Sequence, residues 1–499
     1  MNVSRRFFIG GLAGCAVLGP RRIFAAAPGT FAYGVPELSF GVLSDVHVCL
    51  AKGGRKLKGG YDTAHLEKAF AYFRDNGADA VVIAGDMAHS GLVGELKALA
   101  AAWWKVFPDD KAPDGRHVER VFVFGNHDWS SPGRAKAVFP DEAEMKANYL
   151  SVDPKRHWAD IFHEDWSPFQ VHRVKGYDFV GCHWTNGGCN GTCERFTKGL
   201  VDFYRTLDGK LDPQKPFFHI QHPHPRGTVH GDVWGQDDGE SVKALSRHPN
   251  AISFSGHSHT SLVDERAVWQ GAFTAFGTAT LRDVGPDGLR PGVAAGYENY
   301  RTPKTAKGED ALKVMAAINR FDSKQGQLVR VYGDRIVVSR RDFVNDAALT
   351  DDLVMPLPAA EKKPFAFEPR RAAAKPPRFA SGAALAFAET TAKSRGAKKK
   401  TPPKRCVEIV IPPADAEPTA RGVRYRVTAQ GKNGATLDVA LLHDAFRFAA
   451  TDRRSHAPVK CRLALDRLPK GEVTFEVRAY SCWDKASAPL VATYAPPRA

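Results

Sequence analysis

Long apolar runs are missing from this chain of 499 residues, and no stretch reaches the roughly 18 consecutive apolar residues that a membrane-spanning helix needs. We therefore do not expect the mature chain to cross a membrane. Cysteine is also scarce, with eight residues, and the pair Cys189 and Cys193 has no second pair at zinc-ligand spacing. This absence argues against a cysteine-type zinc site and leaves a disulfide within the loop open.

The chain is too long for a single hydrophobic core, so we expect two or three domains. Its formal charge of +15 is unevenly distributed, because residues 361–499 carry 27 lysines and arginines against 13 aspartates and glutamates. This concentration predicts either contact with an acidic polymer or membrane surface, or merely a solvated face. An attachment of the first kind would weaken steeply as salt is raised. No specific nucleic-acid motif accompanies the charge.

Residues 1–27 carry the features of an export signal rather than of a folded domain. Arg5 and Arg6 precede a short apolar stretch, and three small residues follow at 25–27. This order resembles a twin-arginine signal peptide with its cleavage site, and it predicts a periplasmic or extracellular protein. Cys15 lies in a segment that resembles a lipoprotein cleavage box. It lies only nine residues after Arg6, which leaves almost no apolar region before it and argues against a lipid anchor.

From residue 36 to residue 355, apolar strands alternate with helical segments, which favours parallel β-α-β units with helices on the faces of the sheet. The segment 62–77 illustrates the helices. Asp62 is its candidate N-cap, apolar residues recur at helical spacing, and Gly77 ends the pattern. Residues 327–343 predict a hairpin that closes this domain.

Residues 356–375 are rich in proline, alanine and lysine and predict a linker. Beyond them, short alternating strands predict a small all-β sandwich over residues 376–495. The stretch "LPKGEVTFEVRAYSCWDKASAPL" is similar to the last strands of a fibronectin type III domain, although Val473 stands where that fold has a tyrosine. A basic insertion that contains Lys398, Lys399 and Lys400 interrupts the early strands.

Polar residues with metal-ligand chemistry follow five of the predicted strands. In "VFVFGNHDW" (121–129), four apolar residues run directly into glycine, asparagine, histidine and aspartate. A turn would explain any one such cluster. Five clusters at strand ends favour a site, because α/β sheets bind ligands at the carboxyl ends of their strands. We expect alternation along the strand ends to send both residues of Asp-x-His, and of His-x-His, to one side. The clusters supply Asp45, His47, Asp86, Asn126, His127, His222, His257 and His259.

The five clusters resemble the motifs of the calcineurin-like metallophosphoesterases, which run D-x-H, G-D, G-N-H-[DE], H and G-H-x-H. The resemblance implies an α/β fold, a sandwich of two mixed β-sheets flanked by helices. It also implies a binuclear centre like that of purple acid phosphatases, with two ions of iron, zinc or manganese. One metal would be held by Asp45, His47, Asp86 and His259, and the other by Asp86, Asn126, His222 and His257, with Asp86 as the bridge.

The same resemblance implies hydrolysis of phosphoric esters by a metal-bound hydroxide. His127 would face the phosphoryl group, and Asp128 would orient His127. The residue chemistry agrees, since oxygen and imidazole ligands suit iron, zinc and manganese. The neutral amide of Asn126 leaves the centre a net positive charge, which attracts an anionic ester. Phosphomonoesterase and phosphodiesterase activities both remain open.

Two further histidines are candidates for substrate contact. His183 follows another strand and either touches substrate, is packed in the interior or faces solvent. His224 stands in "QHPHPRG", which favours a place at the rim of the site. The alternative function is a catalytically weak protein that binds an acidic surface through its basic C-terminal region, but no ligand position has been lost. Because no ligand lies beyond His259, we expect a chain ending near residue 355 to retain hydrolysis of a small ester.

Overall fold

The computed structural model describes residues 33–49, 62–186, 196–230, 235–285, 320–392, 402–421 and 423–496. It also describes the backbone of two short paired strands, β2 (Ala51–Lys52) and β3 (Arg55–Lys56). The described residues from Gly34 onward belong to one compact unit.

The first of two mixed β-sheets contains the strands that carry the first three ligand clusters. Its order is β14-β13-β12-β1-β4-β5, with β15 beside β13. Strands β1, β4 and β5 are parallel, whereas the pairs from β12 onward are antiparallel. The bounds are β1 (Leu38–Leu43), β4 (Ala80–Ala84), β5 (Glu119–Val123), β12 (Gln325–Val331), β13 (Arg335–Asp342), β14 (Ala347–Ala348) and β15 (Leu353–Pro356). The antiparallel pair β12–β13 confirms the predicted hairpin.

The second mixed sheet carries the other two clusters and has the order β10-β11-β9-β8-β7-β6. Its four inner strands are parallel, and the two edge strands are antiparallel to their neighbours. The bounds are β6 (Phe169–Val174), β7 (Tyr177–Cys182), β8 (Phe217–Ile220), β9 (Ala251–Ser255), β10 (Val268–Gln270) and β11 (Thr274–Gly277). In both sheets, parallel strands bring the carboxyl ends that carry ligands to one edge.

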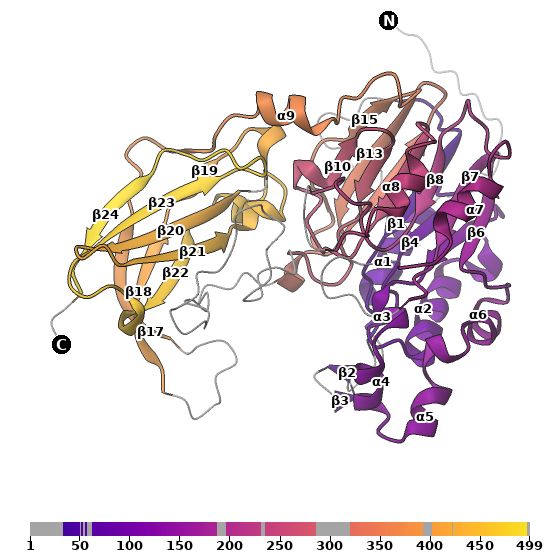
Figure 1. Cartoon of the computed structure of the whole chain (residues 1–499), viewed down its shortest axis with the longest axis horizontal. Coiled ribbons are helices and arrows are strands. Elements are labelled where there is room, and N and C mark those ends of the chain that lie inside the picture. The colour runs from indigo at the N-terminus through magenta and orange to yellow at the C-terminus, as the bar shows by residue number, and fades with distance from the viewer. Residues whose placement is uncertain are drawn as a thin grey trace, which may run out of the picture. The chain divides into compact units, whose positions relative to one another are not determined.

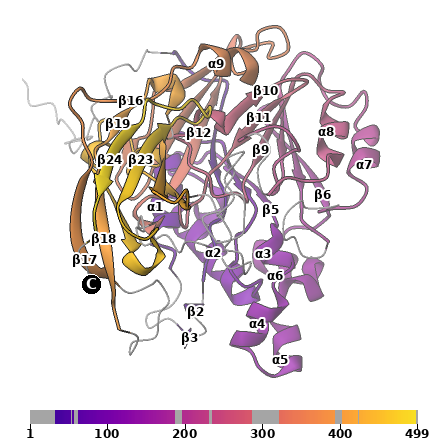
Figure 2. The same ribbon diagram turned by 60° about the vertical axis from the view of Figure 1, so that its left-hand side comes forward.

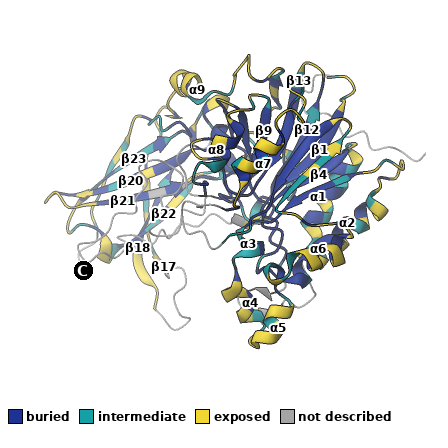
Figure 3. Cartoon of the chain, turned by 45° about the vertical axis from the view of Figure 1, so that its right-hand side comes forward, coloured by how far each residue is buried: buried dark blue, intermediate teal, exposed yellow. Residues whose placement is uncertain are grey.

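The two sheets pack face to face through alternate side chains of their strands. Phe40 of β1 lies 5.1 Å from Phe179, 4.6 Å from Phe218 and 5.7 Å from Phe254, measured between ring centroids. The opposite faces are covered as well, so the strands are buried on both sides and read as continuous apolar runs (Figure 3). This double burial explains the four apolar residues at the start of "VFVFGNHDW".

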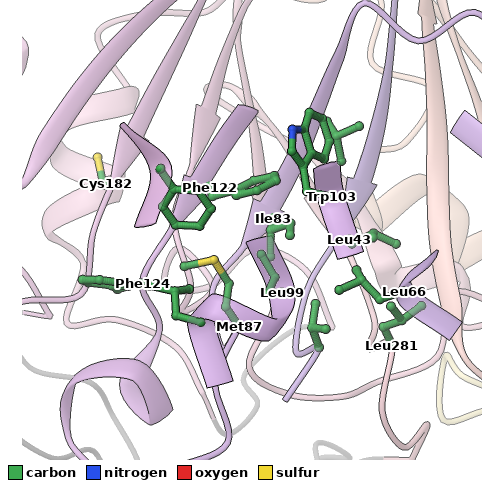
Figure 4. Packing of buried hydrophobic residues seen from close by; sticks show 14 of the residues in the cluster. Leu43, Leu66, Ile83, Met87, Leu99, Trp103, Phe122, Phe124, Cys182 and Leu281 are labelled. Carbon is green, nitrogen blue, oxygen red and sulfur yellow. The ribbon is translucent and has the colours of Figure 1, made fainter. Parts of the chain in front are cut away.

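Helices cover the outer faces of the sheets. On the first sheet, Leu99 and Trp103 of α2 pack beside Ile83 and Phe122 of the strands, with the rings of Trp103 and Phe122 5.5 Å apart (Figure 4). The helices are α1 (Ala64–Asp75), α2 (Val93–Val106), α3 (Asn126–Trp129), α4 (Pro132–Val138), α5 (Glu142–Ala147), α6 (Pro154–Phe162), α7 (Leu200–Thr206), α8 (Glu240–Leu245) and α9 (Phe367–Ala373).

The helix expected over residues 62–77 forms as α1, with one correction at its start. The N-cap is Thr63 rather than Asp62, and the Thr63 hydroxyl donates a hydrogen bond of 3.0 Å to Glu67. The apolar residues at helical spacing are buried, and Gly77 follows the helix with φ of 73°. That left-handed conformation explains why glycine ends the helix.

Two larger antiparallel sheets and one short strand pair follow the first domain in the described part of the chain, as predicted for an all-β region (Figures 1 and 2). Their interior contains Ile409, Val427 and Phe475. The three-stranded sheet has β17 (Ala386–Ala392), β18 (Lys404–Ile411) and β22 (Val459–Ala464); the four-stranded sheet has β20 (Arg424–Gly431), β21 (Thr436–Leu442), β23 (Val473–Tyr480) and β24 (Leu490–Tyr494); β16 (Arg378–Phe379) pairs with β19 (Ala414–Asp415). The predicted fold class is confirmed: an α/β sandwich of two mixed sheets with flanking helices, followed by all-β sheets.

Two features of the C-terminal half bear on the sequence expectations. The segment 356–375, expected as a linker, contains α9, and Arg370 of this helix pairs with Glu265 of the first domain at 2.7 Å. Among the described residues, Cys461 and Cys482 are buried free thiols, as is Cys182 of the first domain.

Candidate metal centre

The seven side chains expected as metal ligands lie just beyond the carboxyl ends of five strands. Asp45 and His47 follow β1, Asp86 follows β4, Asn126 follows β5, His222 follows β8, and His257 and His259 follow β9. Six of them come from short loops and Asn126 opens the short helix α3, so none comes from the strands themselves. The rigid sheets therefore fix where each loop begins, and the loop conformation decides where each side chain points.

The loops bring the ligands together in a way that differs from the expected strand alternation. Asp45 and His47 both have φ of 49°, Asp86 has 54°, and His257 and His259 have 74° and 54°. These angles are left-handed, not extended, so alternation along a strand is the wrong explanation. A left-handed conformation costs a non-glycine residue on the order of 1–3 kcal/mol, and such strain is found mainly at functional sites.

Asp45, His47 and His259 form the first group of ligand atoms. His259 Nε2 lies 2.9 Å from Asp45 Oδ1, and His47 Nε2 lies 3.3 Å from His259 Nε2 and 3.8 Å from Asp45 Oδ1. These three atoms could share one metal ion. All three residues are buried, so few water molecules can compete with their side chains for a metal ion.

Asp86, His222 and His257 form the second group. His222 Nε2 lies 3.3 Å from Asp86 Oδ2, and the rings of His222 and His257 are 4.7 Å apart. The same oxygen, Asp86 Oδ2, lies 3.5 Å from His47 Nε2 of the first group. Asp86 therefore stands between the two groups, at the position that a bridging ligand requires.

Each aspartate binds the backbone with one oxygen and turns the other toward the centre. Asp45 Oδ2 accepts hydrogen bonds from Ser44 Oγ at 2.5 Å and from the His257 amide at 2.9 Å. Asp86 Oδ1 accepts one from the His127 amide at 2.8 Å. The oxygens that point inward, Asp45 Oδ1 and Asp86 Oδ2, are those that lie close to the imidazole nitrogens.

The imidazoles are oriented in the same manner, through Nδ1. His222 Nδ1 lies 2.8 Å from the carbonyl oxygen of Ala84, and His259 Nδ1 lies 3.1 Å from Asp283 Oδ1. An Nδ1–H that donates to such an oxygen leaves the lone pair on Nε2 to a metal ion. Burial lowers the pKa of His222, but the Asp86 and Asp45 carboxylates outweigh it and raise the value to about 9. The carboxylates thus draw positive charge to the site, which a metal ion would supply.

The donor set fits divalent or trivalent metal ions. Asn126 Oδ1 is buried and accepts no hydrogen bond from any residue that the structure describes, and Asp45 Oδ1 and His222 Nε2 also lack a hydrogen bond of good geometry. A buried carbonyl oxygen without a partner is costly unless another group binds it. Oxygen and imidazole donors together suit iron, zinc and manganese.

Two motif glycines let the loops approach each other closely. A Cβ atom on Gly256 would lie 1.7 Å from Ser44 Oγ and 2.4 Å from Asp45 Oδ2. A Cβ atom on Gly125 would lie 2.3 Å from Asp86 Oδ1. Glycine is therefore required at both positions because any side chain would push the ligand aspartates out of place.

His127 lies beside the two groups, with its side chain 17% exposed and Nε2 4.0 Å from Asp86 Oδ2. Its Nδ1 lies 2.8 Å from the carbonyl oxygen of His89. With Nδ1–H donated to that carbonyl, Nε2 is the atom that can bind or release a proton toward the centre. Burial lowers the pKa of His127.

Asp128 does not orient His127 in the way that the sequence suggested. Its carboxylate accepts hydrogen bonds from the amides of Met87 (3.2 Å), Ala88 (2.6 Å) and Gly125 (2.7 Å). It therefore joins the loop that follows β4 to the loop that follows β5. Its effect on His127 passes through the backbone, and the group that holds the imidazole is the His89 carbonyl.

His183 and His224 are both buried, so neither reaches the rim of the site. His183 Nδ1 accepts a hydrogen bond of 3.0 Å from the Phe124 amide, and the geometry favours the packed alternative over substrate contact. His224 lies 2.8 Å from the hydroxyls of both Ser255 and Ser258. It braces the loop that carries His257, which corrects the expectation of a rim residue.

Three residues that border the site, His89, Arg134 and Arg282, were not predicted from the sequence. His89 Nδ1 lies 3.4 Å from His47 Nδ1 and contacts the guanidinium of Arg282. Arg134 Nη1 contacts both ring nitrogens of His127, Nδ1 and, at 2.9 Å, Nε2. The histidines 47, 89 and 127 could also share a cation, but the two guanidinium groups disfavour one there. No motif marks these residues, because Arg282 is 193 positions away from His89 along the chain.

Several sequence expectations fall on residues that the structure does not describe. These are the export signal with Cys15, the pair Cys189 and Cys193, and the lysines at 398–400. Within the described part of the chain, no helix is both long and apolar enough to cross a membrane.

Residues 38–261 match the family described as calcineurin-like phosphoesterase. No curated protein matches the chain. Among solved structures, the chain is similar to a conserved uncharacterized protein and predicted phosphoesterase from Streptococcus pneumoniae TIGR4, with 10% identity, 64% of this chain and 97% of that chain covered, and a TM-score of 0.24.

Two other solved structures are similar over the same share of this chain. Zinc-bound Vps29 from Entamoeba histolytica has 9% identity, with 64% of this chain and 99% of that chain covered, and a TM-score of 0.27. Purple acid phosphatase PPD1 from yellow lupin (Lupinus luteus) seeds has 13% identity, with 64% and 54% covered, and a TM-score of 0.31. TM-scores this low carry no argument about function.

Proposed function

Because residues 38–261 match the calcineurin-like phosphoesterase family, we propose that the protein hydrolyses phosphoric esters with two metal ions in one centre. The observation that carries the proposal is the place of Asp86 Oδ2, 3.5 Å from His47 Nε2 and 3.3 Å from His222 Nε2. One carboxylate oxygen between two sets of buried imidazoles is the arrangement that a pair of bridged ions needs.

The first ion would take Asp45, His47, Asp86 and His259, and the second would take Asp86, Asn126, His222 and His257. Such ions polarise a phosphoryl oxygen and lower the pKa of water. Asn126 contributes a neutral oxygen, so only two carboxylates offset the charge of the ions. The centre stays electropositive and attracts an anionic ester.

His127 is the residue placed to act on the ester itself. Its Nε2 faces the centre beside Asp86, and its Nδ1 is held by the His89 carbonyl. From this position Nε2 can stabilise charge on the phosphoryl group or carry a proton to the leaving oxygen. The hydrogen bonds of Asp128 connect the two loops and thereby hold His127 and Asp86 at fixed positions relative to each other.

The proposal is tested by metal analysis of the purified protein together with assays on nitrophenyl phosphate and bis-nitrophenyl phosphate. We expect two metal equivalents, hydrolysis of at least one ester, loss of activity on chelation, and recovery when zinc, manganese or iron is restored. Protein that holds two metals and hydrolyses neither ester, or that is active without metal, would contradict the proposal.

The arginines at the mouth of the site support a monoester as the substrate. Arg134 lies against His127 Nε2, and Arg282 lies against His89, so two positive groups flank the place where an ester would enter. A phosphomonoester is a dianion near neutral pH, whereas a diester carries a single charge. Both guanidinium groups would therefore stabilise the second negative charge of a bound monoester, which a diester lacks.

We expect Arg282→Gln to lower kcat/KM for nitrophenyl phosphate by about 10–100-fold, the worth of one charged hydrogen bond. Hydrolysis of bis-nitrophenyl phosphate should fall much less, since the diester lacks the second charge. Arg247→Gln is the matched control, because Arg247 is an exposed arginine that pairs with Asp208 away from the centre. Equal losses for the two esters would show that Arg282 does not select the monoester.

A further inference from the structure

The loop that carries His257 and His259 continues into residues 260–267, and this continuation is held by groups from distant parts of the chain. We call residues 256–263 the ligand loop. Its first half is fixed by the site itself, since the His257 amide donates to Asp45 and the Ser258 hydroxyl contacts His224. Its second half has no such anchor in the site and depends on residues outside it.

Two buried side chains provide that anchor: Arg340, whose Nη1 donates to the Leu262 carbonyl at 2.9 Å, and the side-chain amide of Gln325. Gln325 is fully buried at the start of β12, and its Oε1 accepts hydrogen bonds from the Leu262 amide at 2.8 Å and the Ser261 hydroxyl at 3.1 Å. Its Nε2 donates to Ser323 Oγ at 3.0 Å and to the carbonyl oxygen of Arg447 at 2.9 Å. All four hydrogen-bonding capacities of the amide are used.

Gln325 is also linked to the other side of the centre. Its backbone amide donates to the Thr280 carbonyl at 2.9 Å, and the Thr280 hydroxyl donates to the Asp45 carbonyl at 3.0 Å. A displacement of Gln325 would therefore also displace Asp45, in addition to the ligand loop.

The carbonyl group that Gln325 Nε2 contacts belongs to Arg447, in the C-terminal β region, and Arg447 is itself held by neighbouring residues. Arg447 is only 2% exposed, and its guanidinium pairs with Asp444 at 2.6 Å. Arg421 donates to the carbonyl oxygens of Phe448 (2.7 Å) and of Leu349 in the first domain (3.0 Å). The segment 444–448 is thus fixed against the first domain from two directions.

A second connection reaches the chain just beyond the ligand loop. Glu265 pairs with Arg370 of α9 at 2.7 Å and lies 3.7 Å from Arg340. The guanidinium of Arg370 lies over the ring of Trp483, 5.1 Å from its centroid. The residues after His259 are therefore enclosed by α9 and by the C-terminal β region, not by the first domain alone.

We propose that Gln325 is a positioning residue of the metal centre and that the C-terminal β region, through Arg447, is part of the scaffold that holds His257 and His259 in place. The inference rests on the proposed function in one respect, that these two histidines bind metal. It reverses the expectation that a chain ending near residue 355 would keep its activity. The basic C-terminal region then serves the centre directly, whatever surface its charge contacts.

The test compares Gln325→Leu with Gln327→Leu in the full-length protein. Gln327 is the matched control, because it is a buried glutamine on the same face of β12 whose amide donates to the Gly277 carbonyl and not to the ligand loop. We expect Gln325→Leu to release metal to a chelator about 10–100-fold faster than wild type, the usual effect of removing a group that orients a metal ligand. The control should release it at the wild-type rate.

The absorption spectrum of the cobalt(II)-loaded protein separates positioning from a general loss of stability. A displaced histidine changes the cobalt bands of Gln325→Leu, whereas lower stability alone leaves them at their wild-type positions. Arg421→Gln, which loosens the segment 444–448 without touching the ligand loop, should also speed metal release. If it does not, the C-terminal region has no part in the centre.

The outcomes distinguish this inference from the function on which it rests. Wild-type protein that binds no metal would overturn the proposed function. Wild-type protein that binds two metals, with Gln325→Leu and Gln327→Leu alike in release rate and cobalt spectrum, would overturn the role of Gln325 and leave the proposed function standing.

Discussion

Asp86→Ala is expected to lose both metal ions together and to reduce hydrolysis of a small ester by at least about 10³-fold, since each ion contributes several kcal/mol of charge stabilisation. The reason is geometric. Asp86 Oδ2 lies 3.5 Å from His47 Nε2 and 3.3 Å from His222 Nε2, and Asp86 Oδ1 accepts a hydrogen bond from the His127 amide. Asp45 Oδ1 is a poorer bridge, because it lies 2.9 Å from His259 Nε2 but 3.9 Å from His222 Nε2.

The matched control is Asp79→Asn. Asp79 is a buried aspartate at the opposite end of β4, where its carboxylate accepts a hydrogen bond from the Ser39 amide at 2.9 Å. Its loss should lower the free energy of unfolding and leave the metal content at two equivalents. Metal analysis and turnover, measured on both variants, check the prediction. Near-normal activity of Asp86→Ala with two metals bound would mean that Asp86 is not the bridge.

The strand ends of the first domain were accessible from sequence because the signals there are local. A strand buried on both faces reads as an unbroken apolar run, and a polar cluster directly after it stands out, as with Asn126 and His127 after β5. Such runs sufficed to predict parallel β-α-β units with a site at their carboxyl ends, whereas the two mixed sheets and the set of seven ligands were implied by the resemblance to the calcineurin-like metallophosphoesterases.

The conformation of the loops was not accessible in the same way. Asp45 and His257 have left-handed backbones, which sequence patterns disfavour for residues other than glycine. These conformations are maintained by contacts between loops, such as the hydrogen bond from the His257 amide to Asp45, 212 positions away along the chain. A pattern read within one segment cannot contain that information.

The same limit applies to the groups that orient the site residues. Asp128 follows His127 directly, which suggested a direct contact, but its carboxylate is taken up by three backbone amides. Gln325 and Arg282 have neighbours along the chain that carry no motif, and only the packing of distant segments brings them to the centre. The expectation that the first domain would act without the C-terminal region was based on the ligand positions alone. It could not include the contact between Gln325 and Arg447.

His127→Gln is expected to retain two metal ions and to slow turnover by about 10²–10⁴-fold, the usual contribution of a positioned proton donor or acceptor. The metal should remain because the ligand oxygens of Asp86 and Asn126 do not depend on the His127 ring. Metal content and kcat for nitrophenyl phosphate check the two halves of the prediction. His172→Gln, which changes a histidine bonded to Glu119 away from the centre, should be as active as wild type.

The choice of ester then shows which role His127 Nε2 performs. Nitrophenol is a much stronger acid than phenol, so its oxygen leaves without a proton, whereas the phenol oxygen needs one. If Nε2 carries that proton, His127→Gln should slow phenyl phosphate far more than nitrophenyl phosphate. If Nε2 stabilises charge on the phosphoryl group instead, both esters should slow equally. Loss of metal from this variant would place His127 among the ligands and would contradict the role assigned to it here.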